Sequence, residues 1–316
     1  MNHRNSNLAF VFPGQGSQSV GMLDELAASY VEVAQTFERA SDALSFDLWS
    51  LVKDGPIDQL NQTQNTQPAM LAAGVAVWQV WCKQSMVRPA WMAGHSLGEY
   101  TALVCAGVLM FEDAIKLVAE RGRLMQAAVP EGVGAMAAIL GLEDQQVVQV
   151  CMEAAEHEVV AAVNFNAPGQ VVIAGQVAAV DRAIALAKVA GAKKAITLPV
   201  SVPSHCQLMT GAANQLAEKL LAVSFNAPQI PVIHNVDICA HSAPEVIRNA
   251  LKEQLYKPVR WVDSIQFMGD QGVNVFVECG PGKVLVGLNK RIVKLAEHAS
   301  MYSPATLHQI LEQLHG

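Results

Sequence analysis

The segment Gly94-His95-Ser96-Leu97-Gly98 constrains the fold most, because an apolar stretch at residues 88–93 precedes it and an alanine-containing helical stretch follows it. A G-x-S-x-G pattern between a strand and a helix predicts a nucleophile elbow, a strained turn that exposes a serine at the end of a sheet. Glycines are needed where a Cβ would collide with backbone, and the helix N-terminus offers N–H groups to a developing oxyanion. A chance match is the alternative, and the strand and helix context argues against it.

The flanking segments predict an α/β fold with a parallel sheet. Residues 8–12 have the pattern of a buried strand that ends at the Gly14-Gln15-Gly16 loop, and helical patterns follow at 23–43 and 69–83. The alternation resumes after Pro199, with strands expected at 231–235 and 274–278. This strand–loop–helix order is typical of a parallel sheet covered by helices.

The middle of the chain has a different order of elements. Strands are expected at 134–140, 159–163, 170–174 and 193–198, with helices at 143–155 and 177–189 and a turn-rich link at 164–169. The order β-α-β-β-α-β is that of the ferredoxin-like unit. Its length of about 70 residues suits a compact inserted subdomain with a core of its own.

Composition excludes several classes of protein. The chain has 21 basic and 28 acidic residues and a formal net charge of −7, whereas a nucleic-acid-binding domain carries a basic excess. Its longest apolar stretches, at 69–77 and 101–111, are shorter than the roughly 20 residues of a membrane span. Six cysteines without a C-x-x-C pair favour buried thiols in a reducing compartment, so we expect a cytoplasmic protein.

A serine nucleophile needs a base, and His205 is the candidate among nine histidines. It stands in the loop Pro203-Ser204-His205 after the last strand of the inserted unit, and the order serine then histidine fits a hydrolase-like sheet. A purely structural loop histidine is the alternative. Acids between the two residues stand in helices or at helix starts, where capping explains them: Glu112, Asp113, Glu143, Asp144 and Asp181. We therefore predict a Ser–His dyad in which a backbone carbonyl orients the histidine.

Arg121 is the candidate anion-binding residue. Apolar side chains recur at about 100° per residue on one face of the helix that starts at Asp113, and Arg121 projects within that face between Leu117 and Met125. An inward-facing arginine needs an anion, and its planar fork holds a carboxylate through two parallel hydrogen bonds. The alternative is that Arg121 lies at the edge of the apolar face and its aliphatic chain extends towards water, so that the guanidinium is solvated.

The Gly14-Gln15-Gly16 loop is a weak signal alone. It fails the dinucleotide pattern because Ser19 stands at the third glycine position, and it lacks the Gly-Lys-Ser/Thr of a phosphate-binding loop. A tight loop after a strand beside the elbow can instead direct a backbone N–H into the site.

Taken together, six motifs resemble the malonyl-CoA:acyl-carrier-protein transacylases of type II fatty-acid synthesis. The resemblance runs in order from about residue 10 to residue 291. Its motifs are Gly14-Gln15-Gly16-Ser17-Gln18, Gly94-His95-Ser96-Leu97-Gly98-Glu99-Tyr100, Arg121-Gly122-Arg123, Asn164-Phe165-Asn166-Ala167-Pro168-Gly169-Gln170, Pro203-Ser204-His205 and Gly280-Pro281-Gly282. It implies an α/β-hydrolase-like catalytic subdomain at 1–130 and 200–316 that carries the ferredoxin-like subdomain at 131–199.

The resemblance also implies a catalytic set. Ser96 would be the acylated nucleophile and His205 its base. The backbone N–H groups of Gln15 and Leu97 would form the oxyanion hole. The carbonyl that orients His205 would come from Gln254.

A second set of residues would bind the substrate. By resemblance, Arg121 would hold the malonyl carboxylate and His95 would line the site beside the nucleophile. Asn164 and Asn166 match a loop of the small subdomain that faces the cleft. No cofactor or metal is expected, since malonyl-CoA and the phosphopantetheine-bearing carrier protein are themselves the substrates.

The implied enzyme is an S-malonyltransferase that works by ping-pong kinetics and acts on acyl carrier protein, without nucleic acid or membrane as a partner. We expect a monomer. A polyketide-synthase acyltransferase, a serine thioesterase or esterase, and a non-catalytic scaffold are the alternatives. Because carrier proteins are acidic and this chain is net negative, docking predicts a local basic patch. Its candidates are Arg182, Lys188, Lys193, Lys194, Lys283, Lys290 and Arg291.

Overall fold

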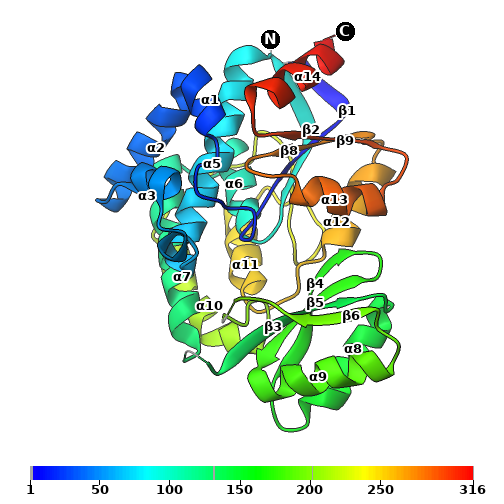
Figure 1. The fold of residues 1–316 in the computed structure, drawn as a ribbon. Helices are drawn as coiled ribbons and strands as arrows, with labels where there is room; N and C mark the ends of the chain where they lie inside the picture. The colour runs from blue at the N-terminus through cyan, green and yellow to red at the C-terminus, as the bar shows by residue number, and fades with distance from the viewer. Residues whose placement is uncertain (1–2, 131, 201, 316) are drawn as a thin grey trace.

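The larger of two sheets holds the elbow (Figure 1). The structure is a computed structural model that describes residues 3–130, 132–200 and 202–315. The five strands lie in the order β7-β2-β1-β8-β9, and every neighbouring pair is parallel. Their bounds are β1 His3–Phe12, β2 Val87–Gly94, β7 Val232–Ile233, β8 Val275–Cys279 and β9 Glu297–Met301. The predicted α/β class with a parallel sheet is confirmed.

Strand β1 shows why this sheet is covered on both faces. Leu8, Phe10 and Phe12 point into one apolar cluster, Ala9 and Val11 point into another, and all five are fully buried. A strand with two buried faces is apolar throughout, as in parallel sheets generally. The sheet is thus a rigid base whose carboxyl ends can hold catalytic groups.

Helices surround the large sheet on both sides. They are α1 Asp24–Ser29, α2 Val31–Leu44, α3 Leu48–Asp54, α4 Ile57–Leu60, α5 Thr63–Gln84, α6 Leu97–Cys105, α7 Phe111–Ala128, α10 Thr210–Leu221, α11 Pro244–Gln254, α12 Trp261–Asp270, α13 Val284–Ile292 and α14 Pro304–His315, with a 3₁₀ turn at Gln207–Met209. The helical pattern at 23–43 is two helices, because Tyr30 is extended, with φ of −136° and ψ of 115°. No helix among the described residues is long and apolar enough to cross a membrane.

The smaller sheet is antiparallel, with the order β4-β5-β3-β6. Its elements follow the predicted β-α-β-β-α-β order: β3 Gly134–Leu140, α8 Asp144–Ala155, β4 Val160–Ala167, β5 Gln170–Gln176, α9 Val177–Val189 and β6 Lys194–Thr197. The predicted turn-rich link at 164–169 is too long, because β4 continues to Ala167 and only Pro168 and Gly169 form the turn. The proposed limits of the two subdomains stay a prediction, and the boundary residue 131 lies outside the described residues.

The two faces of the small sheet have different neighbours. One face packs with α8 and α9 into a separate apolar core that includes Ala137, Ile139 and Ile173. The other face, with Met136 and Val172, lines a cavity that also contains the elbow. The continuation of β4 fixes this arrangement, since Val259 on the loop before α12 donates its N–H to Val163 O at 2.8 Å and accepts from Phe165 N at 3.0 Å. The small sheet therefore forms one wall of the site.

Candidate active site

Ser96 stands at the turn between β2 and α6 in a strained backbone conformation, with φ of 51° and ψ of −106°. The two glycines of the motif permit this turn. A Cβ on Gly94 would lie 1.8 Å from the carbonyl carbon of Gly98, and a Cβ on Gly98 would lie 2.0 Å from the Phe12 carbonyl oxygen. No side chain fits at either position. The predicted elbow geometry is present, and strained backbone of this kind is typical of functional sites.

His205 lies against the serine. Ser96 Oγ is 2.8 Å from His205 Nε2, and His205 Nδ1 is 2.6 Å from the carbonyl oxygen of Gln254. Because a carbonyl only accepts, Nδ1 carries the hydrogen, which leaves the Nε2 lone pair to accept the serine proton. The geometry is that of a dyad whose imidazole is oriented by a backbone carbonyl.

The surroundings of His205 keep it neutral. Burial, followed by the positive charge of Arg121, lowers the pKa of His205 from 6.5 to about 3. Burial also lowers the pKa of His95. Both imidazoles are therefore uncharged near neutral pH, and His205 is in the form that a general base requires.

Arg121 is almost fully buried on α7. Its Nη1 donates to Gln67 Oε1 at 2.7 Å, and its Nη2 donates to Gln254 Oε1 at 3.0 Å and to Ser96 Oγ at 3.2 Å. All three acceptors are neutral, and no ion pair joins Arg121 to any acid in the described part of the chain. Burial lowers the pKa of this guanidinium. A buried cation beside the nucleophile that has no ion-pair partner among the described residues is suited to bind an anion.

Two backbone N–H groups belong to residues that line the cavity beside the nucleophile, Gln15 and Leu97. Leu97 is the first residue of α6, and a Cβ on Gly14 would lie 3.8 Å from its nitrogen, so the Gly14-Gln15-Gly16 loop runs next to it. Among the described residues, neither the Gln15 N–H nor the Leu97 N–H has an acceptor. Free N–H groups at a helix start suit a developing oxyanion.

The cavity in front of Ser96 measures about 480 Å³. It is lined by Gln15, His95, Ser96, Leu97, Arg121, Asn164, Asn166 and His205, among others, so it gathers every predicted site residue except Gln254. Gln254 lies behind the cavity and is fully buried. His95 Nε2 is 2.7 Å from Asn166 Oδ1, which ties the elbow to the small sheet.

Sequence reasoning missed the residues that hold the elbow from behind. Asn235, at the end of β7, accepts the Ser96 N–H on Oδ1 at 2.8 Å and donates from Nδ2 to Gly94 O at 2.8 Å. A usable signal existed, because carboxyl ends of parallel strands meet at one edge of a sheet. Gln67 gave no such signal, since it is one of five consecutive polar residues at the start of α5.

Glu99 was also missed, although it stands within the elbow motif. It is fully buried, and its Oε1 contacts His234 Nδ1 at 2.7 Å. Its Oε2 accepts from Asn235 N at 2.9 Å and from Gln254 Nε2 at 2.8 Å. Capping, the explanation given to acids between serine and histidine, does not apply here. This acid contacts the groups that position the dyad rather than the histidine of the dyad.

Comparison with known proteins agrees with this geometry. The acyl transferase domain family matches residues 9–309. The chain belongs to this family. It is 56% identical over 307 residues to the malonyl CoA-acyl carrier protein transacylase of Escherichia coli (strain K12), which covers 97% of this chain and 99% of that one.

Two solved structures extend the likeness within the family. An acyl carrier protein S-malonyltransferase from Vibrio cholerae is 59% identical, covers 96% of this chain and 99% of its own, and superposes with a TM-score of 0.95. A malonyl-transacylase in complex with a type II polyketide-synthase acyl carrier protein is 53% identical, covers 97% and 99%, and has a TM-score of 0.96. The acyl transferase fold thus extends over almost the whole chain.

Proposed function

We propose that this enzyme transfers a malonyl group from malonyl-CoA to the phosphopantetheine thiol of acyl carrier protein and supplies malonyl-carrier protein for fatty-acid synthesis. One observation carries the assignment: a buried guanidinium, with no ion-pair partner in the part of the chain that the structure describes, stands 3.2 Å from the nucleophile. A general esterase has no need of a cation there. A short acyl group with a terminal carboxylate places its thioester carbonyl at Ser96 and its carboxylate at Arg121.

In the first half-reaction, Ser96 Oγ attacks the thioester carbonyl carbon while His205 Nε2 accepts the hydroxyl proton. The carbonyl oxygen becomes an oxyanion that the N–H groups of Gln15 and Leu97 stabilise. The C–S bond then breaks, His205 returns the proton to the CoA sulfur, and a malonyl-serine ester remains. In the second half-reaction, the carrier-protein thiol loses its proton to His205 and attacks this ester. The C–O bond breaks, His205 returns the proton to Ser96 Oγ, and malonyl-carrier protein leaves.

Substrate binding improves the base in this scheme. The charge of Arg121 is one of the causes that hold the pKa of His205 low. A malonyl carboxylate on Arg121 offsets that charge and raises the pKa of His205, and a base is more effective when its pKa lies nearer to the working pH. The substrate that carries the carboxylate therefore strengthens the proton acceptor that its own transfer requires.

The test is the intact mass of the protein after mixing with malonyl-CoA, beside a Ser96→Ala variant. We expect a malonyl adduct on the wild type only, stable until carrier protein or a pantetheine thiol is added. Release of CoA without a lasting adduct would indicate a hydrolase. The absence of both an adduct and CoA release would contradict the assignment.

The carrier protein requires a docking surface, and the exposed lysines favour the region around the small sheet and α13. Lys188, Lys193, Lys194, Lys283 and Lys290 are exposed. Two arginines of the predicted patch are already engaged: Arg182 pairs with Glu158 at 2.8 Å, and Arg291 donates to Gln170 and to the Pro168 carbonyl. Reversing two of the lysine charges should raise the KM for carrier protein and leave that for malonyl-CoA unchanged. Equal effects on both would contradict a docking role.

A polyketide carrier protein is the alternative acceptor, and the likeness to the transacylase solved with such a partner favours testing it. Comparing kcat/KM for a fatty-acid and a polyketide carrier protein separates the two. We place the reaction in the cytoplasm, which the six unpaired cysteines favour.

A further inference from the structure

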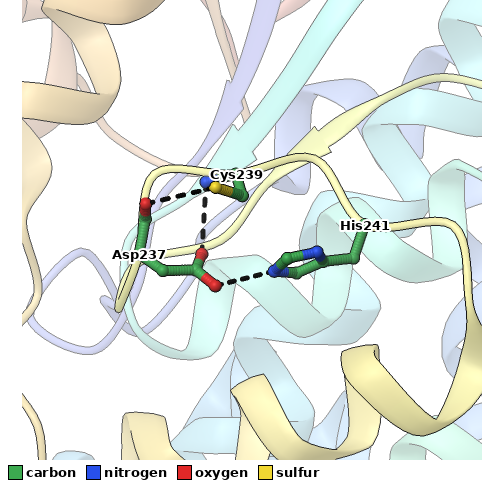
Figure 2. Close-up of side chains that lie close together, drawn as sticks. All are labelled: Asp237, Cys239 and His241. Atoms are coloured by element: carbon green, nitrogen blue, oxygen red, sulfur yellow. Dashed lines mark hydrogen bonds and ion pairs between the residues drawn. The ribbon is translucent and has the colours of Figure 1, made fainter.

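We propose that Asp237, Cys239 and His241 form a binding site for a divalent transition metal, with Zn²⁺ as the preferred ion. The three lie on the loop that follows β7, outside the cavity of the transferase site (Figure 2). Each offers one ligand atom, and these atoms lie within 4.8 Å of one another. They are the one such group of three in the described part of the chain. The proposal goes beyond acyl transfer, which uses none of these side chains.

The backbone of a tight turn brings the three residues together. Ile233 and Ala240 pair as an isolated antiparallel bridge, and His234 N donates to Cys239 O at 3.1 Å. Within the turn, Cys239 N donates to Asp237 Oδ1 at 3.1 Å. Figure 2 shows the carboxylate of Asp237 pointing towards the ring of His241, with the sulfur of Cys239 on the same side of the loop. The ligands are thus assembled by local backbone bonds.

The donor set selects the metal. Thiolate, imidazole and carboxylate are the ligands of Zn²⁺, whereas Ca²⁺ and Mg²⁺ take oxygen ligands. Tetrahedral bonds of about 2.0–2.3 Å place ligand atoms roughly 3.3–3.8 Å apart. The present contact between His241 Nε2 and Asp237 Oδ2 is 2.6 Å, so it opens by about 1 Å on binding. Three protein ligands leave the fourth position to water.

The imidazole of His241 is held on two sides. Asp237 contacts its Nε2, and the ring of His234 stacks on it with centroids 5.2 Å apart and planes 29° from parallel. His234 is fully buried and contacts Glu99 through Nδ1, so it is a fixed surface for the stack. Its Nε2 has no hydrogen-bond partner among the described residues. A ligand ring with restricted rotation loses less entropy when it binds a metal.

The site is open to solvent, which lets the ion enter. Cys239 is the exposed member of the six cysteines. Metal binding replaces the Cys239 S–H bond with a sulfur–metal bond and releases the thiol proton to the buffer. The hydrogen bond between His241 and Asp237 is exchanged for two bonds to the ion. No electron is transferred.

The experiment uses full-length protein freed of metal with a chelator under reducing, anaerobic conditions. Co²⁺ is titrated while the thiolate-to-cobalt charge-transfer absorption is recorded, and Zn²⁺ is then added to displace it. We expect one equivalent of Co²⁺ with a charge-transfer band that Zn²⁺ removes. Cys239→Ser should abolish the band and weaken Zn²⁺ binding by about 100-fold or more, since even an outer partner of a metal ligand contributes 10–100-fold.

His241→Ala should weaken Zn²⁺ binding in the same way, while His157→Ala, which removes an exposed histidine outside the cluster, should leave it unchanged. Metal-free Cys239→Ser should retain full transfer activity, which shows that the variant is folded. The proposal is overturned if the wild type shows no saturable one-to-one binding. Equal affinity in wild type and Cys239→Ser also overturns it, as does a band that persists in the variant.

Discussion

Replacing Glu99 with Gln removes the buried charge behind the elbow while it keeps the shape of the side chain. Glu99 accepts from His234, Asn235 and Gln254 at 2.7, 2.9 and 2.8 Å. A hydrogen bond to a charged group contributes roughly 1.5–3 kcal/mol and one between neutral groups roughly 0.5–1.5. In the variant, the amide oxygen can accept the hydrogen bonds from Asn235 and Gln254, which are then bonds between neutral groups. The NH₂ group faces His234, so the hydrogen bond from His234 is lost. We expect a loss of about 4 kcal/mol in the free energy of unfolding.

The same substitution should lower kcat for malonyl transfer. Asn235 holds the Ser96 N–H and the Gln254 carbonyl orients His205, so both members of the dyad lose support. A displacement of about 1 Å at a reacting group reduces the rate about 100-fold. Denaturant unfolding gives the stability, and single-turnover malonylation of Ser96 gives the rate at a temperature where the variant is folded.

Glu112→Gln is the matched control, because Glu112 is a partly exposed acid in a surface ion pair with Arg39. Such a pair contributes about 1 kcal/mol or less. Wild-type kcat in a folded Glu99→Gln variant would refute a positioning role for this carboxylate. A stability within about 0.5 kcal/mol of the wild type would refute the estimate of its hydrogen bonds.

Three further outcomes follow from the site. Arg121→Ala should reduce the rate of malonyl transfer about 100-fold, because it removes a charge-assisted pair that contributes about 3 kcal/mol, and it should not reduce the rate of acetyl transfer. Equal losses of rate with malonyl-CoA and acetyl-CoA would show that Arg121 has a structural role. The kcat/KM of Ser96 malonylation, which reports the free enzyme, should not fall as the pH is lowered through 6.5, since protonation disables the free enzyme's His205 only towards its pKa of about 3; a midpoint at 6.5 in this profile would contradict the reasoning. Gly98→Ala should prevent correct folding, because its Cβ would meet the Phe12 carbonyl at 2.0 Å, whereas Gly211→Ala, with open space around its Cβ, should not lower the thermal midpoint.

Much of the fold could be predicted because local pattern and tertiary context agree. Strand Gly134–Leu140 and helix Val177–Val189 have the predicted bounds. One exception is the segment from Asn164 to Ala167, whose asparagines indicate a turn by propensity. There the strand is extended by pairing with β5 and with Val259, which is distant in sequence. Local propensity does not report such a partner.

Some of the site residues could likewise be predicted from local sequence patterns, and others could not. Ser96 stands in a motif whose glycines and flanking elements indicate a strand-to-helix turn, and Arg121 could be predicted from helical periodicity. A backbone carbonyl behind His205 was predicted from the lack of a suitable acid, but its assignment to Gln254 came from the resemblance alone, since a backbone acceptor leaves no mark in the side-chain pattern. Asn235 could have been inferred from its place after a predicted strand, whereas the role of Glu99 was out of reach because it depends on partners from distant segments that meet behind the elbow.

The contact between Arg121 and Ser96 has a consequence for selectivity. Without substrate, Nη2 donates to Ser96 Oγ at 3.2 Å and engages a lone pair of the attacking oxygen. In the proposed reaction, a malonyl carboxylate bound by Arg121 would draw the guanidinium to itself and leave that oxygen free. An acyl group without a carboxylate would leave this hydrogen bond to the nucleophile in place. Arg121 would then discriminate between substrates through the reactivity of the serine as well as through affinity.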